Sequence, residues 1–318
     1  MVMQLDLLKR EDLPKDIITV SPSQMSMWYR CRYAWKLAKI DNVGQETYKT
    51  IGAANKGLIF HSFMQWYHNA SRGRAVGTLS PKGKELALDF VKSIHGSDPD
   101  LWRVYTIFIA YTEFMAKHEE MVPLYAEQET WAPTGLISVD GRPIFLHGFI
   151  DLISELFNDI IVTDHKSHTS KPWTRSRLFY DHQFIFYWLM LELQGISVGG
   201  ACVNAIDLAI PANEKLYNPN WVGPKNKRRP RFERFMLSKK DVKLQFYLDE
   251  FLKNIRAMWC TPDPTYEMRL SPDCQYCSFH DHIEMDARGM GEGALIMLQA
   301  RHNTEDFELI DDDEGDVA

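Results

Sequence analysis

The stretch Gly148-Phe-Ile-Asp-Leu-Ile-Ser-Glu-Leu-Phe-Asn-Asp-Ile-Ile-Val-Thr-Asp-His-Lys166 decides the fold. Two apolar runs with strand-like composition flank the turn residues 157–159, and this pattern predicts an antiparallel hairpin. If the turn is centred on Asn158 and Asp159, Asp151 pairs opposite Lys166. The hairpin therefore predicts that charged residues from two strands meet at one place.

Asp164 and Lys166 are two residues apart in the second strand of this hairpin. Residues at this spacing share one face of a strand, so His165 between them points to the opposite face. A carboxylate can hold Mg²⁺, and a neighbouring lysine can orient a water or stabilise developing negative charge. Pairs of this spacing also occur as surface ion pairs that stabilise little. The functional interpretation therefore depends on Asp151 and the residues around it.

The rest of the chain predicts an α/β fold with a helical flank. Asp140-Gly141 is the other turn of a three-strand antiparallel meander. The expected helices span 25–37 (capped by Ser21 or Ser23), 54–70, two segments within 80–120, Thr174–Gln194 and Ser238–Met258 (capped by Ser238). The expected strands span Leu124–Trp131, Ile144–Leu156, Ile160–His165 and Ile196–Ile206.

The net charge of −7 is concentrated at one end of the sequence. Residues 305–318 carry eight acids and no base, which leaves a charge of +1 on the remainder. Such a tail is typically solvated and disordered, although it could also occupy a DNA groove as a mimic. We expect three segments: a helical region over 1–122, a core over 123–285, and a C-terminal extension over 286–318.

Hydrophobic patterning indicates a cytoplasmic protein. The opening Met1-Val-Met-Gln-Leu-Asp6 has a charge where a signal peptide would have an apolar region. The longest apolar run, Phe184 to Leu191, is far shorter than the roughly 20 residues that span a bilayer. We therefore expect no membrane association.

Six short motifs occur in a fixed order between about residues 20 and 280. They are Ser21-x-Ser23 with Tyr29-Arg-Cys31, Gly57-x-x-x-His61, Gly148-x-x-Asp151, Asp164-x-Lys166, Gln183-x-x-x-Tyr187 and Cys274-x-x-Cys277. Together they resemble the RecB/AddB-type branch of the PD-(D/E)xK nuclease superfamily, which includes phage-encoded and CRISPR-associated exonucleases. The resemblance implies a restriction-endonuclease-like core: the meander, a helix and a further strand, flanked by N- and C-terminal helices.

The resemblance also implies roles for individual residues. Asp151, Asp164 and His61 would ligate Mg²⁺ or Mn²⁺, and Lys166 would be the catalytic lysine. Gln183 and Tyr187 would contact DNA or support the lysine. Family members place a further acid on the first strand of the meander, and the sequence offers both Glu127 and Glu129 on one face.

Several members of the family hold the ends of the chain together with a [4Fe–4S] cluster. Cys31, Cys274 and Cys277 match three of its four ligands, but Ile283 stands where the fourth cysteine is expected. His282, His280 and Cys260 are alternative fourth ligands. An iron–sulfur cluster, a zinc site and free thiols all remain open, since both metals accept Cys and His ligands.

A basic segment precedes the last expected helix. Its charged residues are Lys225, Lys227, Arg228, Arg229 and Arg231. Such a run is often only a solvated loop, but beside a nuclease core it predicts a clamp for the DNA backbone. Nothing in it suggests base-specific recognition, so we expect little sequence specificity.

These observations favour a metal-dependent deoxyribonuclease, most simply an exonuclease acting on DNA ends or single strands in recombination, repair or phage DNA processing. The chain has no Walker motif, so any helicase, recombinase or single-strand-binding protein would be a separate partner. Two alternatives remain: a catalytically silent DNA-binding or assembly subunit, and a restriction-type or structure-specific endonuclease.

Overall fold

The computed structural model describes residues 4–41, 51–72, 81–93, 99–118, 120–168, 174–179, 181–208 and 232–262, together with residues 264, 266 and 279. The chain divides into two compact units, Met1–Pro22 with Ile51–Pro262 and Ser23–Thr50 with Asp263–Ala318. The predicted basic segment, the acidic tail, and the predicted ligands Cys274, Cys277 and His282 lie outside the described residues. The three segments predicted from sequence stay a prediction.

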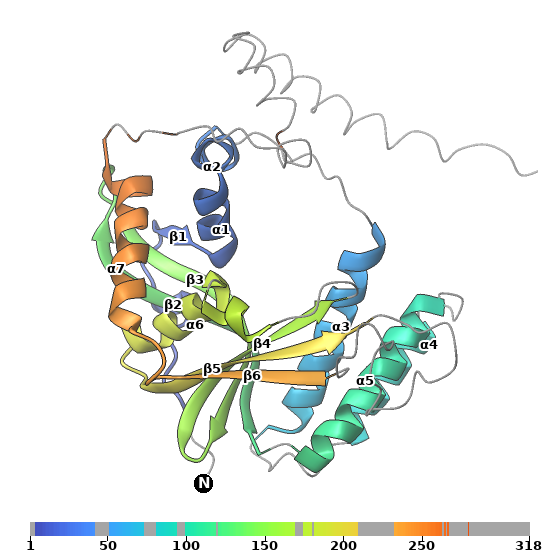
Figure 1. Cartoon of the computed structure of the whole chain (residues 1–318). Helices are drawn as coiled ribbons and strands as arrows, with labels where there is room; N and C mark the ends of the chain where they lie inside the picture. Colours follow the sequence, from blue (N-terminus) through green and yellow to red (C-terminus); the bar gives the residue numbers. More distant parts are fainter. Residues whose placement is uncertain are drawn as a thin grey trace, which may run out of the picture. The chain divides into compact units, whose positions relative to one another are not determined.

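The first unit is built on a six-stranded sheet (Figure 1). The strands are β1 (Ile18–Val20), β2 (Val122–Ile137), β3 (Pro143–Leu156), β4 (Asp159–His168), β5 (Val198–Asp207) and β6 (Phe232–Ser238). Their order is β1-β3-β4-β5-β6, with β2 also pairing with β3. The pairs β2–β3 and β3–β4 are antiparallel, and β5 runs parallel to β4. The predicted α/β fold, with its antiparallel meander and further strand, is confirmed.

The turn between β3 and β4 differs from the prediction by one residue. Phe157 and Asn158 both have positive φ, 52° and 69°, as a two-residue type I′ turn requires. The turn therefore closes between Leu156 and Asp159. The paired residues end at Leu152 and Thr163, and continuation of this register would bring Asp151 to Asp164 and not to Lys166, so that part of the prediction was wrong. The two registers differ by two positions, which keeps the same side chains on the same face.

Three helices pack together in this unit, away from α6 and α7 (Figure 1). They are α3 (Ile51–Ala70), α4 (Pro81–Ser93) and α5 (Pro99–His118), as the sequence predicts. Their apolar faces bury Phe60, Phe63, Phe108 and Tyr111 in one cluster that also includes Phe232 of β6. Burial of large aromatic side chains is a major stabilising contribution. The cluster therefore fixes α3 against the sheet.

Helix α6 (His182–Leu193) begins later than the sequence pattern predicts. The predicted start at Thr174 was wrong, because a short 3₁₀ helix, Arg175–Phe179, comes first. Asp181 is the N-cap of α6, and its carboxylate accepts a hydrogen bond from the Gln183 N–H at 2.9 Å. This cap fixes the orientation of the first turn of α6.

The end of the first unit contains a strand that the sequence reading missed. Ser238, predicted to cap a helix, instead ends β6, and its hydroxyl donates to Asp241 at 2.8 Å in the following turn. Helix α7 then spans Leu244–Ile255, followed by the π-helical turn Arg256–Cys260. The charged residues of β6 interrupt the apolar pattern from which a strand is predicted, because an edge strand tolerates polar side chains on its open side.

The second unit contains α1 (Pro22–Arg30) and α2 (Arg32–Lys39). The single helix expected over 25–37 is divided at Cys31, which is extended and caps α2 by accepting from the Ala34 N–H at 3.5 Å. The Trp35 ring stacks on Tyr266 at 6.2 Å between centroids. Among the helices that the structure describes, none has the length and apolar character of a membrane-spanning segment.

Candidate active site

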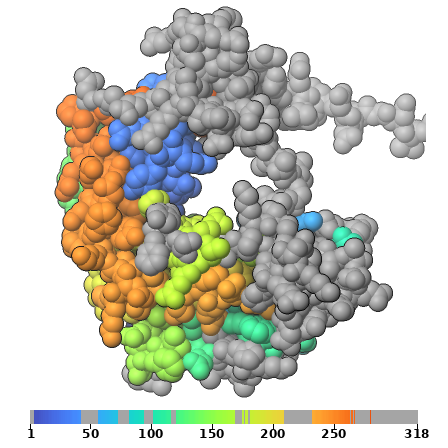
Figure 2. Space-filling view, in the orientation of Figure 1, coloured from blue at the N-terminus to red at the C-terminus, as the bar shows by residue number. Residues whose placement is uncertain are grey.

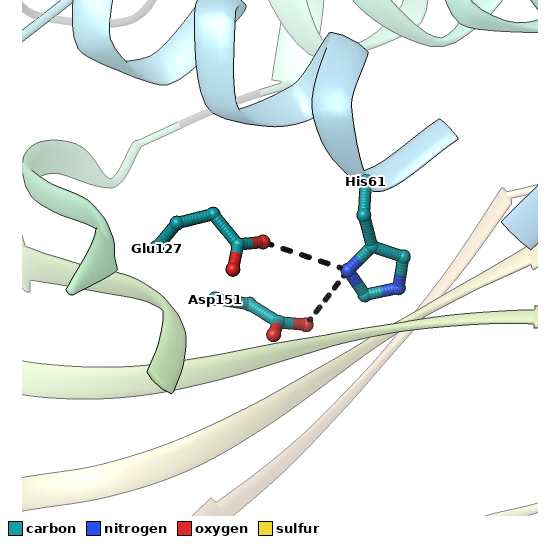
Figure 3. A group of neighbouring side chains, drawn as sticks. All are labelled: His61, Glu127 and Asp151. Atoms are coloured by element: carbon teal, nitrogen blue, oxygen red, sulfur yellow. Dashed lines mark ion pairs between the residues drawn. The ribbon is translucent and has the colours of Figure 1, made fainter. Parts of the chain in front are cut away.

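His61, Glu127 and Asp151 point toward one another in the first unit, with Asp151 buried and the other two partly buried (Figure 3). Nδ1 of His61 lies 3.5 Å from Oδ2 of Asp151 and 3.7 Å from Oε1 of Glu127. One potential ligand atom from each residue lies within 4.8 Å of the other two. They come from α3, β2 and β3, so the site depends on packing of the helix against the meander.

The two acids on β2 differ in their position relative to the cluster. Glu127 joins the cluster, whereas the Glu129 carboxylate lies 2.9 Å from Nε2 of His147 and away from the other ligands. Glu127 also has a φ of 48°, which is costly for a residue with a Cβ. Strained backbone of this kind is maintained where the surrounding structure holds it, often at functional sites.

Two motif glycines are explained by close contacts near the site. A Cβ at Gly148 would lie 3.0 Å from Cε1 of Tyr187, and a Cβ at Gly57 would lie 3.0 Å from Oγ of Ser167. Both distances are shorter than ordinary carbon contacts. Glycine at these positions therefore lets α6 and α3 approach the strands that carry the acids.

A chain of polar contacts connects the second carboxylate to α6. Nζ of Lys166 lies 2.9 Å from Oδ2 of Asp164 and donates to Oε1 of Gln183 at 2.6 Å. The Gln183 amide in turn donates to the Tyr187 hydroxyl at 3.0 Å. Gln183 therefore contacts the lysine directly, and Tyr187 contacts Gln183.

Burial raises the pKa of two carboxyls of the site, those of Asp151 and Asp164. Burial, together with the nearby charge of Asp164, raises the pKa of Asp151 to about 8. Burial also raises the pKa of Asp164, although Lys166 opposes this effect. For His61, burial alone would lower the pKa, but the interactions with Glu127 and Asp151 raise it overall.

These residues fit a divalent metal ion. Within the described part of the chain, the buried Oδ1 of Asp164 has no hydrogen-bond partner, although such atoms normally have one. Asp151 accepts from the His165 N–H at 2.7 Å through one oxygen, which orients the carboxylate. The carboxylate oxygens that predominate in this set suit Mg²⁺ and Mn²⁺.

The layer behind the site was missed in the sequence reading. The buried His165 ring stacks on His68 at 5.4 Å with an interplanar angle of 5°, and its Nδ1 lies 3.3 Å from the Asn204 amide. Nε of Arg234 donates to Oδ1 of Asn204 at 2.8 Å. Alternation in β4 predicts that His165 points away from Asp164, but nothing local identifies its partners.

Comparison with known proteins identifies the class. The family model described as the PD-(D/E)XK nuclease superfamily matches residues 19–282. The chain therefore belongs to this superfamily, whose members are nucleases that use divalent metals. A crystal structure titled as that of SSO0001 aligns with 71% of this chain and 94% of its own at 12% identity and a TM-score of 0.30. No curated protein matches the sequence significantly.

The two acids of β2 allow a matched test of the cluster. We expect Glu127→Gln to weaken Mn²⁺ binding about tenfold or more, because a charged ligand is lost. Glu129→Gln should change the affinity less than about threefold, because the Glu129 carboxylate contacts His147 and is not part of the His61–Glu127–Asp151 cluster. Isothermal titration calorimetry of both variants measures the difference, and equal losses would exclude a specific role for Glu127.

Proposed function

We propose that the protein is a Mg²⁺- or Mn²⁺-dependent deoxyribonuclease that degrades DNA from its ends with little sequence specificity. The observation that carries this proposal is the convergence of His61, Glu127 and Asp151 beside the Asp164–Lys166 pair. The combination supplies ligands for a cation and a fixed positive charge at one place. Both can stabilise the negative charge that develops when a phosphodiester bond is hydrolysed.

Each residue has a distinct role in the proposed reaction. Asp151, Asp164, Glu127 and His61 would hold the metal ion. When bound, the ion supplies a polarised water and stabilises negative charge on the phosphate. The charge of Asp164 raises the pKa of Lys166 despite burial, so the ammonium is available to stabilise the transition state. Gln183 keeps this ammonium in position.

Further assignments rest on the motif order and belong to the same proposal. They are membership of the RecB/AddB-type branch, a role in recombination, repair or phage DNA processing, and cooperation with a separate helicase, recombinase or single-strand-binding protein. The basic residues 225–231 would bind the DNA backbone. Cys31, whose Sγ accepts from the Ala34 N–H, could also serve a metal cluster, but its proposed partners lie outside the described residues.

Comparison of linear and closed circular DNA tests the proposed activity. With Mg²⁺ or Mn²⁺, we expect release of nucleotides from end-labelled linear DNA and no change in covalently closed circles. Chelation of the metal with EDTA should stop the reaction. Nicking or linearisation of the circles would instead identify an endonuclease.

The second candidate function is a catalytically silent DNA-binding subunit. It would bind DNA but release no nucleotides under any metal condition. The intact Asp164–Lys166–Gln183 chain disfavours it, because a buried charge pair without a function is costly to maintain.

A further inference from the structure

A row of aromatic rings lies on the meander beside the candidate active site. The rings of Trp131 and His147 are stacked, with centroids 3.8 Å apart and an interplanar angle of 24°. Phe149 contacts His147 edge to face at 5.7 Å. These three residues, which we call the aromatic row, occupy neighbouring positions on β2 and β3.

The positions of the aromatic row along β2 and β3 place Phe149 on the same face of β3 as Asp151. Trp131 pairs with His147, and Glu129 pairs with Phe149. Phe149 and Asp151 are two residues apart on β3, and alternation along an extended strand puts these two side chains on one face. At about 3.3 Å per residue, Phe149 stands roughly 7 Å along β3 from Asp151. This separation corresponds to about two stacked nucleotides of a DNA strand.

Exposure increases along the row towards the site. Trp131 is 6% exposed, whereas Phe149, next to the acids, is 50% exposed. His147 is held between them because its Nε2 also contacts the Glu129 carboxylate at 2.9 Å. The row therefore presents a rigid, supported ring next to the metal ligands instead of a mobile apolar side chain.

An aromatic ring fixed beside a nuclease centre is suited to one kind of ligand. Unpaired bases stack on aromatic side chains regardless of sequence, whereas paired bases in a duplex have their faces covered by neighbours. A phosphate group would gain little from Phe149 and would be repelled by the Glu129 carboxylate. The aromatic row therefore favours the base of a single strand over the backbone of a duplex.

We infer that Phe149, supported by His147 and Trp131, is a stacking site for an unpaired base of the DNA strand held at the metal centre. This inference rests on the proposed function and specifies its substrate: a single strand or a frayed end. The base stacked there would set the position of the strand relative to Asp151.

Binding of fluorescently labelled single-stranded DNA in EDTA tests the stacking site without cleavage. Phe149→Ala should weaken binding of an oligothymidylate about fivefold to a hundredfold, the range for loss of one base–aromatic stack. Phe149→Trp should retain the affinity, and Phe149→Leu should not. The matched control is Phe246→Ala: Phe246 is 65% exposed on α7, which forms part of the surface in Figure 2.

A single abasic nucleotide moved along the oligonucleotide identifies the contact. At one position, loss of the base should weaken binding by the wild-type protein as much as Phe149→Ala does. At that position, the abasic nucleotide should not weaken binding by Phe149→Ala any further. Equal affinities of Phe149→Ala and Phe246→Ala would overturn the inference. Equal losses of affinity of Phe149→Ala for single-stranded and for blunt duplex DNA would overturn it too. So would a different oligomeric state of Phe149→Ala, measured by light scattering, because the loss would then follow from altered assembly.

The two proposals fail separately. If the protein cleaves no DNA but still shows the Phe149-dependent, base-dependent affinity, the stacking site stands and the nuclease proposal fails. If the protein releases nucleotides from linear DNA and Phe149→Ala binds single-stranded DNA as the wild type does, the nuclease proposal stands and the stacking site fails.

Discussion

Asp164→Asn should lower metal-dependent DNA cleavage by about a thousandfold or more while leaving the fold intact. A metal ion contributes several kcal/mol to stabilising the transition state, and each 1.36 kcal/mol corresponds to a factor of ten in rate. The substitution removes the charge that attracts the ion and anchors Lys166 at 2.9 Å. Asparagine has nearly the same shape, so the packing around this 1%-exposed side chain should persist. Single-turnover cleavage of end-labelled linear DNA measures the rate.

Asp181→Asn is the matched control for this experiment. It removes the same charge from the same neighbourhood, but Asp181 acts as the N-cap of α6, a role that asparagine fills equally well. We expect its cleavage rate to remain within about fivefold of wild type. Comparable losses in both variants would mean that general electrostatics, and not ligation by Asp164, controls the reaction. More than a tenth of wild-type activity in Asp164→Asn would contradict the proposed site.

Local patterns were sufficient for the parts of the site that lie within one element. The two-residue period of β4 places Asp164 and Lys166 together, and the four-residue spacing on α6 places Gln183 and Tyr187 together. The turn at 157–158 shows the limit of this reasoning. A one-residue difference in the centre of the turn changed the partner of Asp151, although the face was preserved.

Other features could not be predicted because they arise between elements. Glu127 and Glu129 are the same residue type and lie two residues apart on β2, so the sequence pattern does not distinguish them. The structure distinguishes them by the positive φ at Glu127 and by the contact of Glu129 with His147. The stack of His165 on His68 joins positions that are distant in sequence. Strand β6 was not predicted because its last residue, Ser238, also suits a helix cap, and the two charged residues Glu233 and Arg234 interrupt its apolar pattern.

The stability of the metal-free protein should fall as pH rises from about 6.5 to 8. The pKa of Asp151 is raised to about 8 by burial and by Asp164, whereas a carboxyl of an unfolded chain titrates near 3.9. The folded state therefore binds more protons than the unfolded state in this window, and stability decreases as they are released. His61 acts in the same direction, since its pKa is raised and the stability it contributes is lost as it deprotonates.

The lower limit of this window is set by two other histidines. Burial, with a contribution from Arg234, lowers the pKa of His68 to about 3, and burial lowers that of His165 as well. Below about pH 6.5 the unfolded state binds protons at both, so there stability rises with pH and opposes the carboxylates. The decrease expected above pH 6.5, of order 1 kcal/mol per pH unit per proton, therefore reports on the acids of the site.

Bound metal should abolish this decrease, because a cation stabilises the ionised carboxylates and binds more tightly as they lose protons. At about a hundredfold excess of Mn²⁺ over its dissociation constant, the stabilisation should reach roughly 2.7 kcal/mol. Thermal unfolding in EDTA and in Mn²⁺, at several pH values between 6.5 and 8, measures both effects. In Asp151→Asn the metal-free decrease should be much smaller, since the group with the raised pKa is gone. A decrease of equal size in this variant, or one that persists in saturating Mn²⁺, would show that other groups control the stability. The burial that raises the pKa of Asp151 would then not be the force that prepares the site for a cation.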